Sequence, residues 1–153
     1  EGIVKGEKIR QATRIHAVSE ILAADTEWAR VLEIAASEEV KVIISNATES
    51  GITFHEADAK RIQSGLVPET FPGKLTACLF HRWKKGSENT RRLYVLPTEL
   101  IENNATTLHS IVLNLAEVAQ CSQDFIDWLH GSVQFCNTLV DRIVPGTPDT
   151  NSL

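Results

Sequence analysis

The chain has 153 residues, of which 42% are hydrophobic and 23% charged, a composition typical of a globular domain that can bury its own core. The net charge of -5 at pH 7 does not favour binding to nucleic acid. The sequence has no long apolar run of the kind that would indicate a membrane partner. Widely spaced cysteines without a C-x-x-C pair fit a reducing, cytoplasmic location. The histidines lack metal-ligand spacing, so no metal site is expected.

The sequence contains no methionine, and both of its ends are polar and rich in turn residues. We therefore expect a piece of a longer chain, in which residues 146–153 act as a linker.

The first predicted elements are short. Residues 12–17 and 20–24 are mixed runs that predict edge strands, and Asp25 or Thr26 is expected to cap the helix that follows. The β-branched run at residues 40–44 predicts a strand buried in a parallel sheet, and a polar segment at residues 45–51 follows it.

The middle of the chain predicts one further helix after a polar excursion. Residues 55–68 carry many charges with little periodicity and are expected to face solvent. Thr70 to Gly73 predict the start of a helix, and Lys74 in its first turn opposes the helix dipole, which favours either an anionic partner or a surface position.

Residues 91–119 hold the most informative pattern. The apolar run at residues 93–96 predicts a buried strand that stops at Pro97, and helical spacing resumes at Ala105, with Asn103 or Asn104 as the cap. A short helix is expected after Ser122. Because helices alternate with apolar runs, the chain predicts an α/β fold with a mostly parallel sheet, whose ligands bind at the carboxyl ends of the strands.

A nucleotide-binding sheet commonly carries the phosphate loop G-x-G-x-x-G, and the glycines of this chain never take that spacing. If the fold binds a dinucleotide, the first half of the domain is missing.

Segments of the chain resemble the mannitol dehydrogenase family of polyol-specific long-chain dehydrogenases. The matching segments are Asn46–Ile52, Phe71–Thr76, Pro97–Asn104 and Phe135–Gly146. Within the family, the Pro-x-Glu-Leu-Ile pattern at Pro97 favours the uronate reductases. The family's usual glycine after the last asparagine is replaced by Ala105.

The resemblance implies a two-domain enzyme in which residues 1–145 form the second half of a Rossmann-like, NAD-binding domain and a missing C-terminal helical domain completes the substrate site. The resemblance also implies which residues line the cofactor groove: Ser45, Asn46, Thr48, Glu49, Pro97, Thr98 and Glu99.

The resemblance also assigns catalytic roles. Asn104 is expected to help hold the reacting oxygen, since a prepositioned amide stabilises developing charge, and Asp141 is expected to orient the catalytic lysine or polar substrate groups. The family's Lys-x-x-x-x-Asn-x-x-His pattern does not occur here, so the general base lies outside this chain. The implied reaction is hydride transfer between NADH and a keto-uronate, a small sugar-acid substrate.

Other interpretations stay open at this point. Asn104 can be only a helix cap, Asp141 and Arg142 can each belong to a structural ion pair, and Thr48 and Glu49 can simply turn the chain. The whole can be a non-catalytic nucleotide-binding or scaffolding domain, or a mannitol or fructuronate reductase of the same family.

Overall fold

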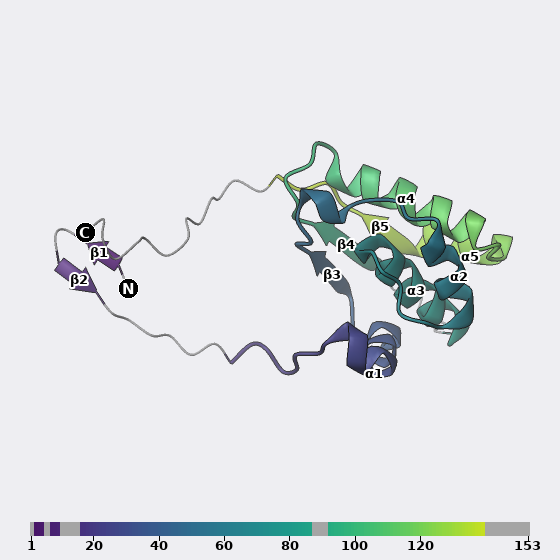
Figure 1. Cartoon of the computed structure of the whole chain (residues 1–153), viewed down its shortest axis with the longest axis horizontal. Coiled ribbons are helices and arrows are strands. Elements are labelled where there is room, and N and C mark those ends of the chain that lie inside the picture. Colours follow the sequence, from purple (N-terminus) through teal and green to yellow (C-terminus); the bar gives the residue numbers. More distant parts are fainter. Residues whose placement is uncertain (1, 5–6, 10–15, 87–91, 140–153) are drawn as a thin grey trace.

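The computed structural model describes residues 2–4, 7–9, 16–86 and 92–139. Two short strands at the start, β1 (Gly2–Val4) and β2 (Glu7–Ile9), pair with each other in antiparallel fashion. The rest of the described chain forms a sheet with helices beside it (Figure 1). In these parts of the chain, no helix has the length and apolar character needed to cross a lipid bilayer.

The sheet has three parallel strands in the order β3 (Val42–Ser45), β4 (Leu93–Pro97) and β5 (Val133–Phe135). Their register places Ile44 beside Leu96 and Val95 beside Phe135. Each crossover between neighbouring strands carries helices, as parallel pairing requires. The predicted parallel α/β fold is therefore confirmed.

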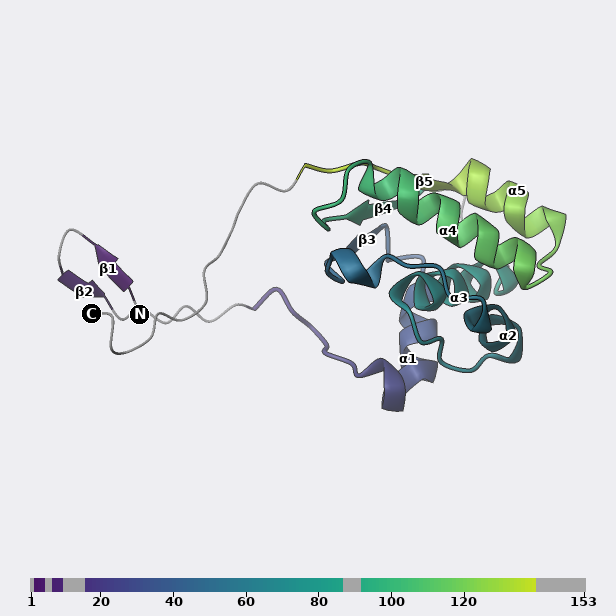
Figure 2. The same ribbon diagram turned by 45° about the horizontal axis from the view of Figure 1, so that its top comes forward.

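The helices are α1 (Ala24–Ala36), α2 (Ala57–Ser64), α3 (Phe71–Lys84), α4 (Asn104–Val118) and α5 (Gln123–Ser132), with a short 3-10 turn, η1 (Glu49–Gly51). Helix α3 packs against both α1 and α4, and α4 packs on β4. In both ribbon views α4 and α5 lie on one side of this body and α1 lies on the other, with α3 between them (Figures 1 and 2).

The core lies between the helices and one face of the sheet. In β4, Leu93 and Val95 are buried against the helices, and the aromatic ring of Phe125 from α5 is fully buried with them. The opposite face is open, because Ile44 is 67% exposed and Tyr94 is 42% exposed. Parallel sheets are normally covered on both faces, so the described residues cover only half of this one.

Two predictions about the start of the chain are wrong, namely the edge strand at residues 20–24 and the cap of the following helix by Asp25 or Thr26. Residues 20–23 form no strand, and α1 begins at Ala24 with Ala23 at its cap position, where the backbone N–H of Ala23 donates to Glu27 Oε2 at 2.8 Å. An edge strand needs a neighbouring strand, which a local pattern cannot supply. Of the other predicted run, residues 16–17 are irregular and residues 12–15 lie outside the described part.

The prediction of a solvent-facing excursion at residues 55–68 is only partly correct, because most of the segment is exposed but one of its charges is not. The segment contains α2, in which Asp58 is fully buried and accepts hydrogen bonds from the Glu69 N–H at 2.6 Å and from the Thr70 hydroxyl at 2.6 Å. Thr70 in turn caps α3 by accepting from the Gly73 N–H, and Lys74 donates to the Glu69 carbonyl. The Asp58 carboxylate, which was expected to face solvent, therefore holds the start of α3 in place. This role depends on tertiary packing, which the local sequence pattern does not show.

Candidate functional site

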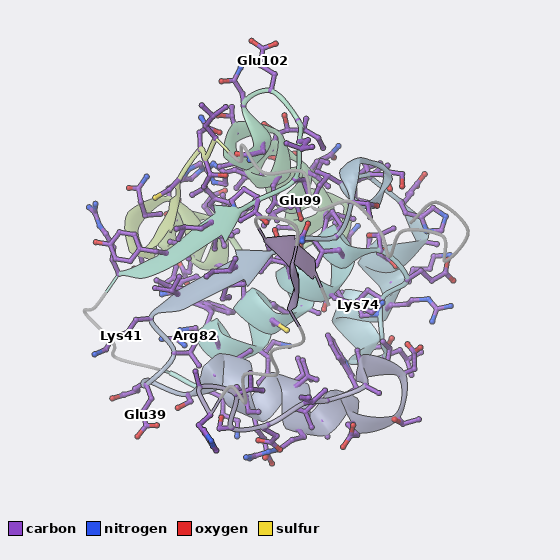
Figure 3. All side chains as sticks on the ribbon, turned by 90° about the vertical axis from the view of Figure 1, so that its left-hand side faces the viewer. Glu39, Lys41, Lys74, Arg82, Glu99 and Glu102 are labelled. Atoms are coloured by element: carbon purple, nitrogen blue, oxygen red, sulfur yellow. The ribbon has the colours of Figure 1, made fainter. Side chains whose placement is uncertain are left out.

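Polar segments follow all three parallel strands where they end. Because the strands are parallel, their carboxyl ends meet at one edge of the sheet, which brings together residues 45–48, 97–104 and 136–138. In Figure 3, the Glu99 side chain lies near the centre of the molecule, whereas the Glu102 side chain points outwards at the top. The predicted gathering of strand-end segments is present.

Glu99 joins the ends of β3 and β4. Its side chain is 3% exposed, and its carboxylate accepts from the Ser45 hydroxyl at 3.1 Å and from the Ala47 N–H at 2.8 Å. Thr98 adds two bonds, since its backbone N–H and its hydroxyl both donate to the Ser45 carbonyl, at 2.9 and 2.6 Å. A buried carboxylate needs such donors, so these residues form a stable junction, named here the β3–β4 clamp.

Beyond this clamp the chain turns outwards. Asn46 and Thr48 are exposed, and the Thr48 backbone has φ 63° and ψ 163°, a conformation that β-branched residues seldom adopt. The Thr48 and Ser50 hydroxyls lie 3.2 Å apart. Unfavourable backbone geometry of this kind clusters at ligand sites, so the segment is a candidate contact surface.

Asn104 joins the ends of β4 and β5. It is 1% exposed, and its amide nitrogen donates to the Pro97 carbonyl and the Thr138 hydroxyl, each at 3.0 Å. Its amide oxygen accepts from the Thr138 N–H at 3.1 Å and from the Ala105 N–H at 2.8 Å. The Thr138 hydroxyl donates to the same Pro97 carbonyl. Both polar atoms of Asn104 are therefore engaged inside the chain.

Asn137 supplies the cap of α4. Its Oδ1 accepts from the backbone N–H groups of Ala105 at 2.9 Å and Thr106 at 3.1 Å. Asn103 occupies the cap position in a left-handed conformation and makes no side-chain cap bond among the described residues. The expectation that Asn103 or Asn104 caps the first turn is thus largely wrong: only Asn104 contributes, through the Ala105 N–H. Asn137, Thr138, Asn104 and Pro97 together are named the β4–β5 clamp.

The chemistry of this edge suits neutral polar groups rather than phosphates. Residues 45–51 and 97–104 contain no lysine or arginine, and their polar groups are hydroxyls, amides, carboxylates and backbone N–H groups. These groups hydrogen-bond readily to sugar hydroxyls and carboxamides. Within the described part of the chain, no cluster of histidine, cysteine, aspartate and glutamate could hold a metal ion.

One titratable group lies behind the second clamp. The His109 ring stacks on Phe135 with centroids 4.5 Å apart, and the His130 ring lies 5.6 Å away. Burial, and to a lesser degree the neighbouring His130, lower the pKa of His109. Its Nε2 is buried and has no hydrogen-bond partner among the described residues. The partly buried imidazole therefore packs on Phe135 at the end of β5.

The structure brings most of the predicted site residues to this one edge: Ser45, Asn46, Thr48, Pro97, Thr98, Glu99 and Asn104. Glu49 lies in η1, and only its backbone is described. Asp141 lies outside the described residues. Asn137 and Thr138 were missed as site residues, although two polar residues shortly after a predominantly apolar stretch, here Phe135 and Cys136, are the same signal that marked the other strand ends.

The fold and its polar strand ends define a Rossmann-like α/β domain. In structure, the chain is similar to a mannitol 2-dehydrogenase of Pseudomonas fluorescens solved as a ternary complex with NAD and D-mannitol, with a TM-score of 0.72 and 23% identity over 90% of this chain and 29% of that one. It is also similar to a D-sorbitol dehydrogenase solved in substrate-free form, with a TM-score of 0.68 and 20% identity over 84% of this chain and 28% of that one.

Sequence comparison identifies the family of the chain. Residues 3–152 match the mannitol dehydrogenase Rossmann domain, and the chain belongs to this family. It is 41% identical to an altronate oxidoreductase of Halalkalibacterium halodurans over 96% of this chain, and 39% identical to an altronate oxidoreductase of Bacillus subtilis over 97%. The chain spans only 28% and 30% of the length of these two relatives. The predicted family resemblance is confirmed.

Proposed function

We propose that the full-length protein is an NAD-dependent oxidoreductase that reduces a keto-uronate, tagaturonate, to altronate. The observation that carries the proposal is the meeting of the polar ends of β3, β4 and β5 at one edge, in a chain of the mannitol dehydrogenase family. The relatives named altronate oxidoreductases, together with the Pro-x-Glu-Leu-Ile pattern at Pro97, support the uronate substrate.

In this proposal the β3–β4 clamp forms part of the cofactor wall. Asn46 and Thr48 are the exposed contacts, Glu49 extends the same segment, and the buried pair Ser45 and Glu99 holds it in place. The absence of lysine and arginine from these segments suits the ribose and nicotinamide end of NAD better than its phosphates. Bound NADH supplies the hydride for the reaction.

The β4–β5 clamp serves the substrate side. The carbonyl carbon of the substrate gains a hydride and its oxygen gains a proton, so the reaction produces a secondary alcohol. Every polar atom of Asn104 is already engaged, which favours a role in positioning the site over direct contact with the reacting oxygen. Asp141 is proposed to orient the catalytic lysine, which belongs to the C-terminal domain of the full-length protein together with the general base. A cytoplasmic location suits such an enzyme of sugar-acid metabolism.

A substrate panel tests the proposal. The full-length protein is mixed with NADH and, in separate reactions, with tagaturonate, fructuronate and fructose, and NADH absorbance is followed. We expect turnover of tagaturonate with a kcat/KM at least about tenfold above that of the other two, a difference of about 1.4 kcal/mol in transition-state binding. Turnover of fructose alone would contradict the assignment of a keto-uronate as the substrate. If none of the three compounds is reduced, the proposed function is wrong.

A further inference from the structure

The first turn of α4 starts at the site, and its cap comes from a distant part of the chain. A helix start leaves backbone N–H groups without helical partners, and a local side chain usually satisfies them. Here the residue at the cap position, Asn103, has φ 53° and ψ 43° and forms no side-chain cap bond within the described chain. Asn137, which follows β5, takes that task.

The bonds of Asn137 and Thr138 interlock with those of α4. Asn137 Oδ1 accepts from the N–H groups of Ala105 and Thr106, and its Nδ2 donates to the Thr106 hydroxyl at 3.1 Å. In the opposite direction, Thr138 bonds to both polar atoms of Asn104. Two consecutive residues after β5 therefore hold three consecutive residues at the start of α4.

We infer that Asn137 is a positioning residue for hydride transfer, an inference that rests on the proposed function. The Ala105 N–H is shared between Asn104 Oδ1 at 2.8 Å and Asn137 Oδ1 at 2.9 Å, so the two asparagines are anchored on one group. Without Asn137 the Thr106 N–H loses its acceptor, the first turn loosens and Asn104 shifts. Small displacements of a positioning group cost up to about a hundredfold in rate.

The effect falls mainly on one side of the site, although the Asn104 amide also donates to the Glu99 carbonyl at 3.2 Å. Glu99 fixes the cofactor side through Ser45 and Ala47, and no hydrogen bond among the described residues links Asn137 to those two residues. Loss of Asn137 should therefore lower kcat while leaving the affinity for NADH intact. A purely structural cap predicts a lower melting temperature and no change in kcat for the folded enzyme.

The experiment compares variants of the full-length protein. Asn137→Ala removes the acceptor, Asn137→Asp keeps an acceptor that favours a helix start, and Asn114→Ala on the exposed side of α4 is the matched control. We expect kcat with the preferred substrate to fall at least about tenfold in Asn137→Ala, with the NADH Kd within about twofold of wild type. Asn137→Asp should recover most of the rate, and Asn114→Ala should match wild type.

Other outcomes overturn the inference in distinguishable ways. A folded Asn137→Ala enzyme with wild-type kcat, or with equal losses in kcat and NADH affinity, removes the positioning role and leaves the proposed function standing. An inactive wild type removes the proposed function, and this inference with it. If Asn137→Ala is unfolded at the assay temperature, Asn137→Ser replaces it, because the serine hydroxyl is too short to reach both N–H groups. The kcat and NADH Kd of Asn137→Ser are then compared with those of Asn137→Asp under the same criteria.

Discussion

The two clamps join neighbouring strand ends by different means. The β3–β4 clamp relies on one buried carboxylate, Glu99, that accepts from a hydroxyl and a backbone N–H, and the segment beyond it turns outwards to Thr48. The β4–β5 clamp relies on neutral amides, with Asn104 and Asn137 bonded to backbone groups on both sides. The first clamp supports an exposed contact segment, whereas the second fixes a helix start. We therefore expect changes in the two clamps to affect different properties.

The largest effect is expected from Asn104→Leu. The substitution leaves the Thr138 N–H and one bond of the Pro97 carbonyl unsatisfied in a buried site, which should lower the free energy of unfolding by about 3 kcal/mol. Urea unfolding measures this change. Asn114→Leu, an exposed site on the same helix, serves as the control, and equal stability of the two variants would contradict the role of the β4–β5 clamp.

Glu99→Ala should cost less, because the Ala47 N–H that loses its acceptor is only partly buried and lies between the exposed residues Asn46 and Thr48, where water can replace the carboxylate. We expect a loss of about 1 to 2 kcal/mol in urea unfolding, and a smaller loss for Glu99→Gln, which keeps one acceptor. Glu117→Ala on an exposed turn of α4 is the control. A Glu99→Ala loss above that of Asn104→Leu would reverse the ranking of the two clamps.

His109 makes the region behind the β4–β5 clamp sensitive to acid. Its pKa is lowered in the folded protein, so below the ordinary value of 6.5 the unfolded chain binds a proton that the folded chain does not. Above pH 6.5 the imidazole is neutral in both states and does not lower the free energy of unfolding. As the pH falls from 6.5 towards the pKa of the folded state, the free energy of unfolding decreases. His109→Gln should flatten the slope of unfolding free energy in that range, with His16→Gln controlling for loss of an imidazole; an unchanged slope would reject this account.

The smallest effect is expected on the open face of the sheet. Ile44 is 67% exposed on β3, so Ile44→Thr should change the free energy of unfolding of the 153-residue chain by less than about 0.5 kcal/mol. Val95→Thr, which faces the helices on β4, is the contrasting variant and should cost clearly more, because it places a hydroxyl in the core. Equal losses would mean that both faces are covered.

The sequence predicted the parallel sheet and its polar strand ends, because β-branched runs and helical spacing are local signals, as at residues 40–44 and 93–96. It did not predict α2, since the burial of Asp58 depends on the approach of the Thr70 segment. The cap from Asn137 was also missed, because Asn137 lies 32 residues from Ala105 and only the fold joins them. Local patterns thus located the edge of the site, and long-range contacts decided which residues serve it.

The affinity for NADH tests most directly whether the β3–β4 clamp supports the cofactor. Fluorescence titration of the full-length protein with NADH compares wild type, Glu99→Ala and Asn137→Ala. We expect Glu99→Ala to raise the Kd at least about tenfold, or about 1.4 kcal/mol, and Asn137→Ala to leave it within about twofold of wild type. An unchanged Kd in a folded Glu99→Ala protein would contradict the cofactor role of the β3–β4 clamp.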